Sequence, residues 1–419
     1  MRVLQVHNLA LQRGGGAEDV ISGDADLLRS RGCEVDQFFA DNADIAAMSR
    51  VRAGISAIWN QAVARALGSA IDRFRPDVVH VHTPFPLMSP AVFRVSSHRG
   101  VATIATAHSF RYSCINAVLY RRGKVCELCL GKRFKLAGVR HRCYHGSAFG
   151  SAAMTTSLAL HRGIGTFRNH VDVWTANSEF MRTRLMEEGL PFERIVVKPN
   201  TTPDPGFVPH VTSRHLLFVG RLLPEKGVPA MLQAWATSPD LPELTIVGDG
   251  PLGGLVRSAA GRDRRITWTG WLDIGAVREE IARARFLLLP SEWYEGGVPV
   301  VALQAFAAGT PIIASDVGNF SDAVRPGRNG YLFHSGDVSS MAAAVREAVA
   351  VTTAEQLAGL RTAARETYLT QYSEERNITT LLSAYRRAME IRGSIRQTGN
   401  GEGGHVIAST GNPETEVSP

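Results

Sequence analysis

The sequence predicts an α/β fold with two doubly wound parallel-sheet domains that face each other across a cleft. The chain has 419 residues, enough for two or three domains at roughly 150 residues each. Short apolar runs rich in Val, Ile and Leu alternate with longer segments of helical periodicity, a pattern typical of buried parallel strands and their connecting helices. Three prolines and a glycine between residues 199 and 206 divide this pattern into two halves.

The apolar runs predict two series of strands. The first series is Val3–Val6, Val78–Val81, Val101–Ala105, Val171–Ala176 and Ile195–Val197. The second series is Leu216–Val219, Leu244–Val247, Ile266–Trp268, Phe286–Leu289 and Ile312–Ala314. Open α/β sheets bind ligands at the carboxyl ends of their strands, so we expect the site between the two domains.

The domain boundaries follow from these series. Residues 1–200 form the predicted N-terminal domain, which carries a basic, Cys-rich insertion at 111–145, and residues 201–371 form the C-terminal domain. The pattern also predicts helices over 341–365 and 374–392, and we expect the segment 372–392 to pack back toward the N-terminal domain. Residues 393–419 are rich in Gly, Ser, Thr and Pro and predict a disordered tail.

Composition excludes several classes of protein. With 44% hydrophobic and 20% charged residues the chain is neither fibrous nor disordered. No apolar stretch reaches the 18 or so residues of a membrane span, and the N-terminus does not resemble a signal peptide, so we expect a cytoplasmic protein. Five cysteines do not make a disulfide framework.

Positive charge is concentrated in one segment. The net charge is +7, and residues 111–145 hold nine basic residues and a single acidic one, Glu127. Such a patch suits phosphates or an anionic membrane surface, which predicts a peripheral position at the inner face of the cytoplasmic membrane; the alternative is a solvated basic loop. Few aromatic residues interleave with the charges and no nucleic-acid motif is present, so no specific nucleic-acid partner is expected.

Two segments suggest a phosphate site in the C-terminal domain. Gly220 ends a predicted strand, and Arg221 and Lys226 follow it at the mouth of a predicted helix, where two cations can neutralise a diphosphate. In the second segment a strand leads through Glu295 and a glycine turn into an apolar helix from about Pro299. Free backbone N–H groups at such a helix start bind phosphate, and the Glu295 carboxylate can accept hydrogen bonds from sugar hydroxyls.

These and other motifs resemble one known family. In order they are Gly14-Gly15-Gly16-Ala17-Glu18, His108, Ser178-Glu179-Phe180, Val197-Lys198-Pro199-Asn200, the segment from Gly220 to Gly227, Gly248-Asp249-Gly250-Pro251, Thr269-Gly270, the Glu295 segment, and Gly309-Thr310-Pro311 with the strand after it. Together they resemble the family 4 retaining glycosyltransferases, which have two Rossmann-like domains in the architecture called GT-B. The resemblance covers most of residues 1–390 and is close to a bacterial subset with a Cys-rich insertion in the acceptor domain.

The resemblance implies a donor site for a nucleotide sugar, a UDP- or GDP-sugar, in the C-terminal domain. Arg221 and Lys226 would hold the diphosphate and Glu295 would contact the sugar. The chain departs from the E-x7-E pattern of the family, because eight residues separate Glu295 from Gln304, which can still bond a ribose hydroxyl but carries no charge. The predicted donor-binding residues are Gly220, Arg221, Lys226, Gly250, Glu295, Gly296, Gly297, Val298, Pro299 and Gln304.

The N-terminal domain would supply the acceptor side. Gly14, Gly15 and Gly16 follow the first strand, where the family places a loop between acceptor and diphosphate, and a flexible surface loop is the alternative. Glu18 is a weaker candidate. His108 follows a strand at the position where the family has a histidine near the transferred sugar.

Four cysteines form a second pattern, Cys114, Cys126, Cys129 and Cys143, spaced C-x11-C-x2-C-x13-C. A structural zinc ion bound by these thiolates, reduced thiols and disulfides are the three alternatives.

The function that the sequence predicts is retaining transfer of a sugar to a saccharide or lipid-linked acceptor, in cell-surface polysaccharide or glycolipid synthesis. His108, Glu295, Arg221 and Lys226 are the predicted catalytic-site residues, with no catalytic cofactor and no dependence on divalent metal. A sugar-nucleotide epimerase of the same fold and a catalytically weak nucleotide-sugar-binding scaffold subunit are the alternatives.

Overall fold

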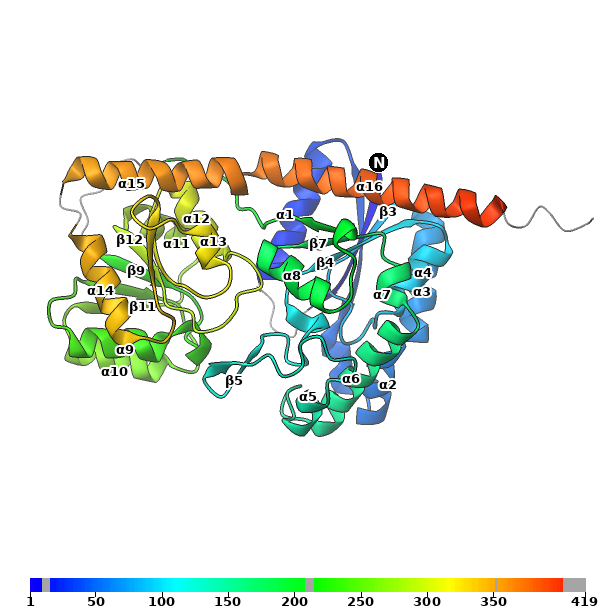
Figure 1. Ribbon diagram of the computed structural model, residues 1–419, viewed down its shortest axis with the longest axis horizontal. Helices are drawn as coiled ribbons and strands as arrows, with labels where there is room; N and C mark the ends of the chain where they lie inside the picture. Colours follow the sequence, from blue (N-terminus) through cyan, green and yellow to red (C-terminus); the bar gives the residue numbers. More distant parts are fainter. Residues whose placement is uncertain (10–15, 208–214, 351–352, 402–419) are drawn as a thin grey trace, which may run out of the picture.

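Two parallel sheets form the body of the structure, one in each half of the chain (Figure 1). The computed structural model describes residues 1–9, 16–207, 215–350 and 353–401. The strand order is β2-β1-β3-β4-β7-β8 in the N-terminal sheet and β11-β10-β9-β12-β13-β14 in the C-terminal sheet. The predicted fold class, two doubly wound Rossmann-like domains facing across a cleft, is confirmed.

Each predicted apolar run overlaps a strand. The N-terminal sheet contains β1 (Arg2–Leu9), β2 (Glu34–Asp41), β3 (Val78–Val81), β4 (Ala102–Ala107), β7 (Val173–Ala176) and β8 (Ile195–Val197). The C-terminal sheet contains β9 (Leu216–Val219), β10 (Leu244–Val247), β11 (Ile266–Gly270), β12 (Phe286–Leu289), β13 (Ile312–Ser315) and β14 (Gly330–Phe333). The sequence missed β2 and β14, which are edge strands, as well as the hairpin of β5 (Tyr120–Arg121) and β6 (Lys124–Val125). The largely exposed β2 lacks the continuous apolar run that a buried parallel strand needs.

Apolar clusters lie on both faces of the sheets. In β1, Val3 packs with Ile378 and Tyr385 of the last helix, whereas Leu4 and Val6 belong to the cluster on the other face. The N-terminal helices are α1 (Gly16–Ser30), α2 (Arg50–Ile58), α3 (Gln61–Phe74), α4 (Ala91–His98), α5 (Leu136–Arg140), α6 (Ala148–Gly163), α7 (Thr166–Asn169) and α8 (Glu179–Glu187). The C-terminal helices are α9 (Val228–Thr237), α10 (Gly253–Arg262), α11 (Ile274–Arg283), α12 (Val300–Ala308), α13 (Phe320–Ala323), α14 (Val338–Val349), α15 (Ala354–Thr367) and α16 (Glu374–Gly401).

Two helix predictions need correction. The single helix expected over 341–365 is two helices, α14 and α15, and Thr353 begins the second with a capping box. The disordered tail expected from residue 393 is also wrong in its first part, since α16 continues to Gly401. Residues 393–401 show no apolar periodicity because Ile395 is the single apolar residue among them. Residues 402–419 lie outside the described part of the chain.

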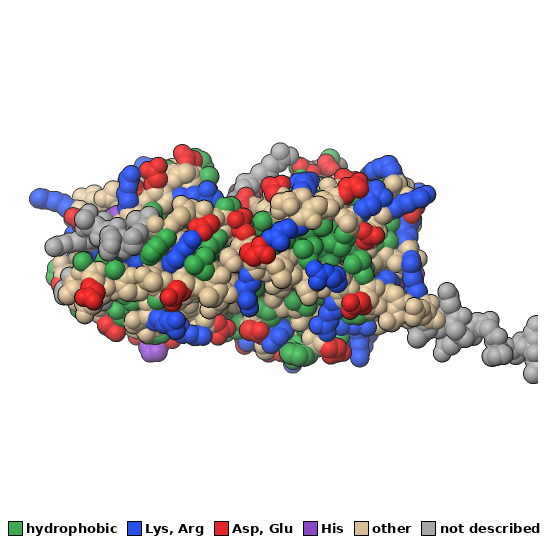
Figure 2. Space-filling view, turned by 90° about the horizontal axis from the view of Figure 1, so that it is seen from above, with side chains coloured by type: hydrophobic (Ala, Val, Ile, Leu, Met, Phe, Trp, Pro, Cys, Tyr) green, Lys and Arg blue, Asp and Glu red, His purple; other side chains and the backbone are tan. Residues whose placement is uncertain are grey.

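The last helix joins the two domains. After α15 and a π-turn (Tyr368–Tyr372), α16 runs along the N-terminal domain (Figure 1). Its Tyr385 hydroxyl lies 2.8 Å from His80 Nδ1, and Arg392 forms a buried ion pair with Asp172 at 3.0 Å. Figure 2 shows the molecule from above, where acidic and basic side chains are interspersed. Within the described residues, we find no helix with the length and apolar character to cross a bilayer.

The strand orders place two switch points at the cleft. The strands are parallel, and the direction in which successive strands are added across the sheet reverses between β1 and β3 in one sheet and between β9 and β12 in the other. Ligands of open α/β sheets bind at such points, beyond the carboxyl ends of the strands. A cavity of about 500 Å³ lies between the domains, lined by Asn177 and Ser178 from one side and by Val298 and Asn319 from the other.

Candidate functional site

The two predicted phosphate-binding segments flank the switch point of the C-terminal sheet. The segment after β9 continues from Gly220 into a short 3-10 turn, Pro224–Lys226, and the segment after β12 begins at Pro290. They touch at Gly227, where an added Cβ would lie 1.8 Å from the Pro290 carbonyl oxygen. Only glycine allows this close approach. The positive φ of 72° at Gly227 also favours glycine, because other residues rarely adopt it.

Lys226 and Glu295 meet in an ion pair at the centre of the site. Lys226 Nζ lies 2.6 Å from Glu295 Oε1, and the Ser291 hydroxyl donates to the same oxygen at 2.8 Å. The Glu295 backbone carbonyl accepts from Asn319 Nδ2 at 2.7 Å. Since Glu295 is only 7% exposed, these bonds fix its carboxylate beside the Lys226 ammonium group. One cation and one anion are therefore held together with most of both side chains away from solvent.

The glycine turn after Glu295 contacts the opposite domain. A Cβ on Gly296 would stand 2.6 Å from the carbonyl oxygen of His108, and one on Gly297 would stand 2.7 Å from Cβ of Asn177. His108 follows β4 and Asn177 follows β7, so the turn packs against the carboxyl edge of the N-terminal sheet. Glycine is required at both positions by space. The predicted donor loop and the predicted acceptor histidine thus lie side by side.

The remaining donor-side residues occupy the same edge. Helix α12 begins after Pro299, and no side chain caps its first N–H groups. Arg221 is exposed at the mouth of the site, and Gly250 packs so closely on Leu222 that a Cβ would lie 2.8 Å from its carbonyl oxygen. Gln304 is in the interior of α12 and only 6% exposed. The structure therefore brings together the two segments, and it buries Gln304 in the supporting helix.

Three histidines line the carboxyl edge of the N-terminal sheet. His82 Nδ1 lies 3.0 Å from His108 Nε2, with the two rings stacked, and the His7 ring meets His82 edge-on. Burial lowers the pKa of His108 to about 3, helped by the charges of His7 and Lys198, and burial lowers the pKa of His7 to about 4. Burial also holds the pKa of His82 well below 6.5, so all three rings are neutral near pH 7.

His7 and His82 were missed by the sequence analysis. Like His108, each of them lies toward the end of an apolar strand. Neither belongs to a motif of the resembling family, and such a motif is what drew attention to His108. Neither ring nitrogen of His7 has a hydrogen-bond partner among the described residues, although the side chain is 4% exposed. Glu18, in the first turn of α1, lies close enough to raise the pKa of His7. Gly16 begins α1, whereas Gly14 and Gly15 lie outside the described residues.

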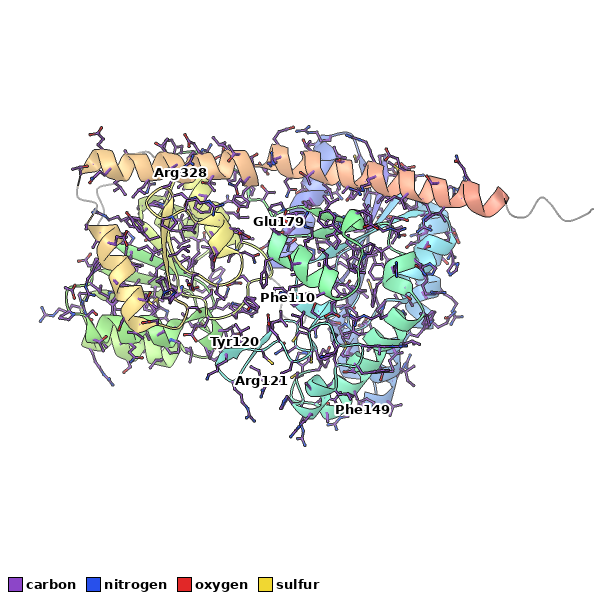
Figure 3. All side chains as sticks on the ribbon, in the orientation of Figure 1. Phe110, Tyr120, Arg121, Phe149, Glu179 and Arg328 are labelled. Carbon is purple, nitrogen blue, oxygen red and sulfur yellow. The ribbon has the colours of Figure 1, made fainter. Side chains whose placement is uncertain are left out.

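Aromatic contacts also cross between the domains. Tyr294, beside Glu295, packs its ring 4.6 Å from Phe180 and 6.4 Å from Phe110. Tyr120, in the β5–β6 hairpin, lies beside Glu292; burial and this carboxylate raise the pKa of Tyr120 to about 12. Figure 3 shows Phe110 and Tyr120 on the side of the N-terminal domain that faces its neighbour. The basic insertion therefore reaches the donor side.

The basic segment is smaller at the surface than its composition suggests. Lys135 is fully buried and pairs with Glu188 at 3.1 Å. Arg111 turns inward, with its guanidinium carbon 5.4 Å from the centre of the Tyr144 ring. Arg122 and Lys124 remain exposed on the hairpin. Two of the nine basic side chains thus support the fold of the insertion and do not contribute to a surface patch.

The four cysteines surround one small cavity, but the structure does not support a zinc site. Cys114, Cys126, Cys129 and Cys143 all line it as free thiols. Among the described residues, no group of three or more His, Cys, Asp or Glu side chains is placed to hold a metal ion. Without a metal ion, burial raises the pKa of Cys129 to about 11, so this thiol is neutral near pH 7. The close spacing of the cysteines reflects packing of the insertion core.

Comparison with known families identifies both halves of the chain. Residues 14–203 match the family model described as Glycosyltransferase Family 4, and residues 213–350 match the model described as Glycosyl transferases group 1. The chain belongs to the family 4-like GT-B glycosyltransferases. The two matched regions divide where the two sheets divide.

Individual relatives cover this GT-B chain in part. An exopolysaccharide phosphotransferase of Streptomyces coelicolor is 36% identical over 161 residues, 36% of this chain and 17% of that protein. The putative teichuronic acid biosynthesis glycosyltransferase TuaC of Bacillus subtilis is 27% identical over 253 residues, 59% of this chain and 54% of that protein. The crystal structure of Anabaena HepE in complex with UDP aligns with a TM-score of 0.59 at 16% identity, covering 96% of this chain and all of that one. This last likeness shows the fold.

Proposed function

We propose that this chain is a retaining glycosyltransferase that moves a sugar from a UDP- or GDP-sugar to a saccharide or lipid-linked acceptor. The observation that carries the proposal is the packing of the Gly296–Gly297 turn, beside the Lys226–Glu295 pair, on the edge that holds His108. The solved structures of HepE with UDP and with UDP-glucose support a nucleotide-sugar donor. The name of TuaC supports a role in cell-surface polysaccharide or glycolipid synthesis.

On the donor side, charge complementarity assigns the roles. Arg221, Lys226 and the uncapped start of α12 would hold the diphosphate with Gly220, Gly250, Val298 and Pro299 around it. Lys226 would then bridge the diphosphate and Glu295, whose carboxylate would contact the sugar. Gln304 would bond the ribose from α12.

The transfer step needs no nucleophile from the protein. The bond from the anomeric carbon to the diphosphate oxygen breaks, the acceptor oxygen bonds to the same face, and the acceptor proton passes to the departing phosphate. The sugar gains oxocarbenium character and the diphosphate gains negative charge, which the fixed cations stabilise. His108, with its pKa lowered to about 3, is neutral and would position the sugar by hydrogen bonding without donating a proton as an imidazolium acid.

Thermal stabilisation by nucleotides tests the proposal. A panel of UDP, GDP, ADP, TDP and their sugars should raise the melting temperature for one base only, because a ligand that binds the folded state stabilises it. Arg221→Ala should abolish that shift at unchanged stability without ligand, since Arg221 is exposed. A shift equal in wild type and variant would contradict the diphosphate site. Donor turnover without any acceptor, yielding an epimeric sugar nucleotide, would favour the epimerase alternative.

A peripheral membrane position is part of the proposal. The insertion exposes Leu128, Phe134 and Leu136 next to Lys132 and Arg133. Apolar side chains flanked by cations suit the interface of an anionic bilayer. Such a position would bring a lipid-linked acceptor to the site.

A further inference from the structure

A large cavity in the N-terminal domain has no role in the donor site. It has a volume of about 490 Å³ and lies between helices α2 and α6. Ala53 and Ala57 of α2, Ala153 and Met154 of α6 and Pro86 form much of its wall. This volume is typical of small-molecule sites, which are mostly apolar with a few polar groups.

Part of the cavity wall comes from the carboxyl edge of the N-terminal sheet, the proposed reaction edge. Ile45 follows β2 and Pro86 follows β3, whereas Tyr144 lies between α5 and α6 in the long connection from β4 to β7. His7, His82 and His108 lie at the same edge. A ligand that fills the cavity can therefore extend toward the histidines.

Two side chains that follow His108 in the sequence pack against residues at the cavity wall. Arg111 packs over the ring of Tyr144, and Tyr112 meets the Phe85 ring edge-on at 5.8 Å. Arg111 and Tyr112 belong to the short 3-10 turn Phe110–Tyr112 that follows the predicted acceptor histidine. The cavity and the reaction edge are thus parts of one packed unit.

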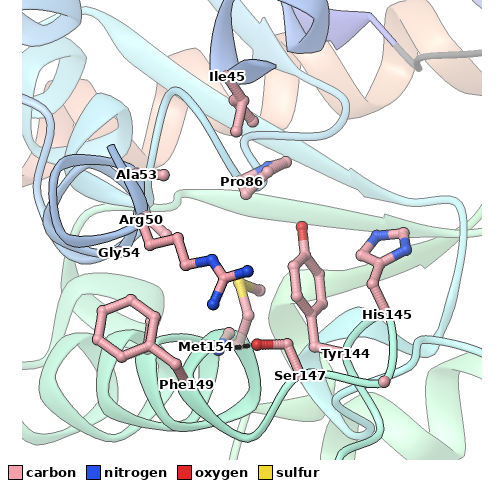
Figure 4. Close-up of a pocket in the computed structure, with 14 residues that line it drawn as sticks. Ile45, Arg50, Ala53, Gly54, Pro86, Tyr144, His145, Ser147, Phe149 and Met154 are labelled. Carbon is pink, nitrogen blue, oxygen red and sulfur yellow. Dashed lines mark hydrogen bonds between the residues drawn. The ribbon is translucent and has the colours of Figure 1, made fainter. Parts of the chain in front are cut away.

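The mouth of the cavity has a cation and an apolar rim. Arg50 extends into the cavity between Phe149 and Tyr144 (Figure 4). Phe149 on α6, about half exposed, forms the apolar part of this rim, whereas the exposed Val51 and Ile55 lie on another face of α2. Phe149 lies so close to α2 that a Cβ on Gly54 would be 2.8 Å from its ring. An apolar interior, an apolar rim and one guanidinium group fit a molecule with a hydrocarbon chain and an anionic headgroup.

We propose that the α2–α6 cavity binds the hydrocarbon chain of an anionic amphiphile, the lipid that carries the acceptor. The inference rests on the proposed function and selects the lipid-linked class among its acceptors. Arg50 would bind the headgroup phosphate, and the chain would occupy the space between Ala53, Ala153 and Met154. The headgroup sugar would then point toward His108.

Octyl, decyl and dodecyl phosphate, used below their micelle concentrations, test the cavity by calorimetric titration. Each methylene group that enters the cavity should strengthen binding about fourfold, and inorganic phosphate alone should bind far more weakly. Ala53→Phe places a ring in the cavity and should remove the dependence on chain length. Thr156→Phe is the matched control, because Thr156 is exposed on α6 and does not line the cavity. Arg50→Gln should weaken binding of decyl phosphate at least about tenfold while leaving decanol unaffected.

UDP binding, measured on every variant, separates this inference from the proposed function and reports folding. Retained UDP binding with no chain-length dependence in wild type would overturn the cavity assignment and leave the transferase proposal intact. Equal binding of decyl phosphate by wild type and Ala53→Phe would overturn it as well. A chain-length series that Ala53→Phe abolishes, in a protein that binds none of the nucleotides, would support the cavity and overturn the transferase proposal.

Discussion

Replacing Gly297 with Ala tests whether the two domains must meet at the glycine turn. The new Cβ would stand 2.7 Å from Cβ of Asn177, whereas carbon atoms pack at about 3.7 Å, so the two backbones must separate by about 1 Å. Asn177 cannot yield by rotating its side chain, because Cβ is fixed to its backbone. A displacement of about 1 Å between reacting groups lowers a rate by about 100-fold. The diphosphate contacts that we propose lie within the C-terminal domain, so the affinity for the nucleotide should not change.

Two measurements on the same protein check this prediction. Calorimetric titration gives the Kd of the nucleoside diphosphate, and release of that diphosphate from the donor gives kcat. Gly254→Ala is the control, since Gly254 lies in α10 of the same domain and a Cβ there meets no atom within 4 Å. Wild-type kcat in Gly297→Ala would refute the argument that close contact of the domains is needed. So would a loss of nucleotide binding as large as the loss of kcat, because it would place the defect on the donor side.

Two further predictions concern pH and the membrane. Burial lowers the pKa of His7 from 6.5 to about 4. Between these two pH values the unfolded chain takes up a proton that the folded chain does not. The free energy of unfolding should therefore fall by about 1.4 kcal/mol per pH unit as the pH drops from 6.5 to 4. In urea titrations at pH 7, 6 and 5, His7→Phe should reduce this slope, and parallel curves for the two proteins would refute the assignment. Neutralising Arg122 and Lys124 should lower the affinity for phosphatidylglycerol vesicles, measured by co-sedimentation, about thirtyfold, at about 1 kcal/mol per charge. Neutralising Arg262 and Arg264 is the control and should not change this affinity. Equal effects of the two pairs would exclude docking through the insertion.

The sequence predicted the parts of the fold that are buried on both faces. Central strands such as β9 and β12 are continuous apolar runs, and the segments that follow them hold the proposed donor-side residues. Strand β2 and the end of α16 were not predicted, because β2 is largely exposed and residues 393–401 contain a single apolar residue, Ile395. The edge strand β14 was missed although it is mostly buried.

Some candidate site residues could be predicted from short sequence motifs, whereas others are brought together only by the fold. Lys226 and Glu295 are within short motifs, and the structure places them in contact. His7 and Asn177 sit at the ends of strands far apart in sequence, and only the strand order brings them to one edge. The cysteine spacing around Cys129 left zinc, reduced thiols and disulfides as alternatives, and the structure has free thiols around one small cavity and supports no zinc site.

The insertion connects the chemistry of the two domains. Its hairpin places Tyr120 beside Glu292 on the donor side, its 3-10 turn places Arg111 on Tyr144 at the cavity, and Lys135 anchors it to Glu188. The proposed donor side uses motifs that the chain has in common with its family. Under the proposals above, differences in acceptor would therefore arise in the insertion and the α2–α6 cavity. Because the insertion also lies beside Glu292, its contacts link the wall of the cavity to the segment that follows β12.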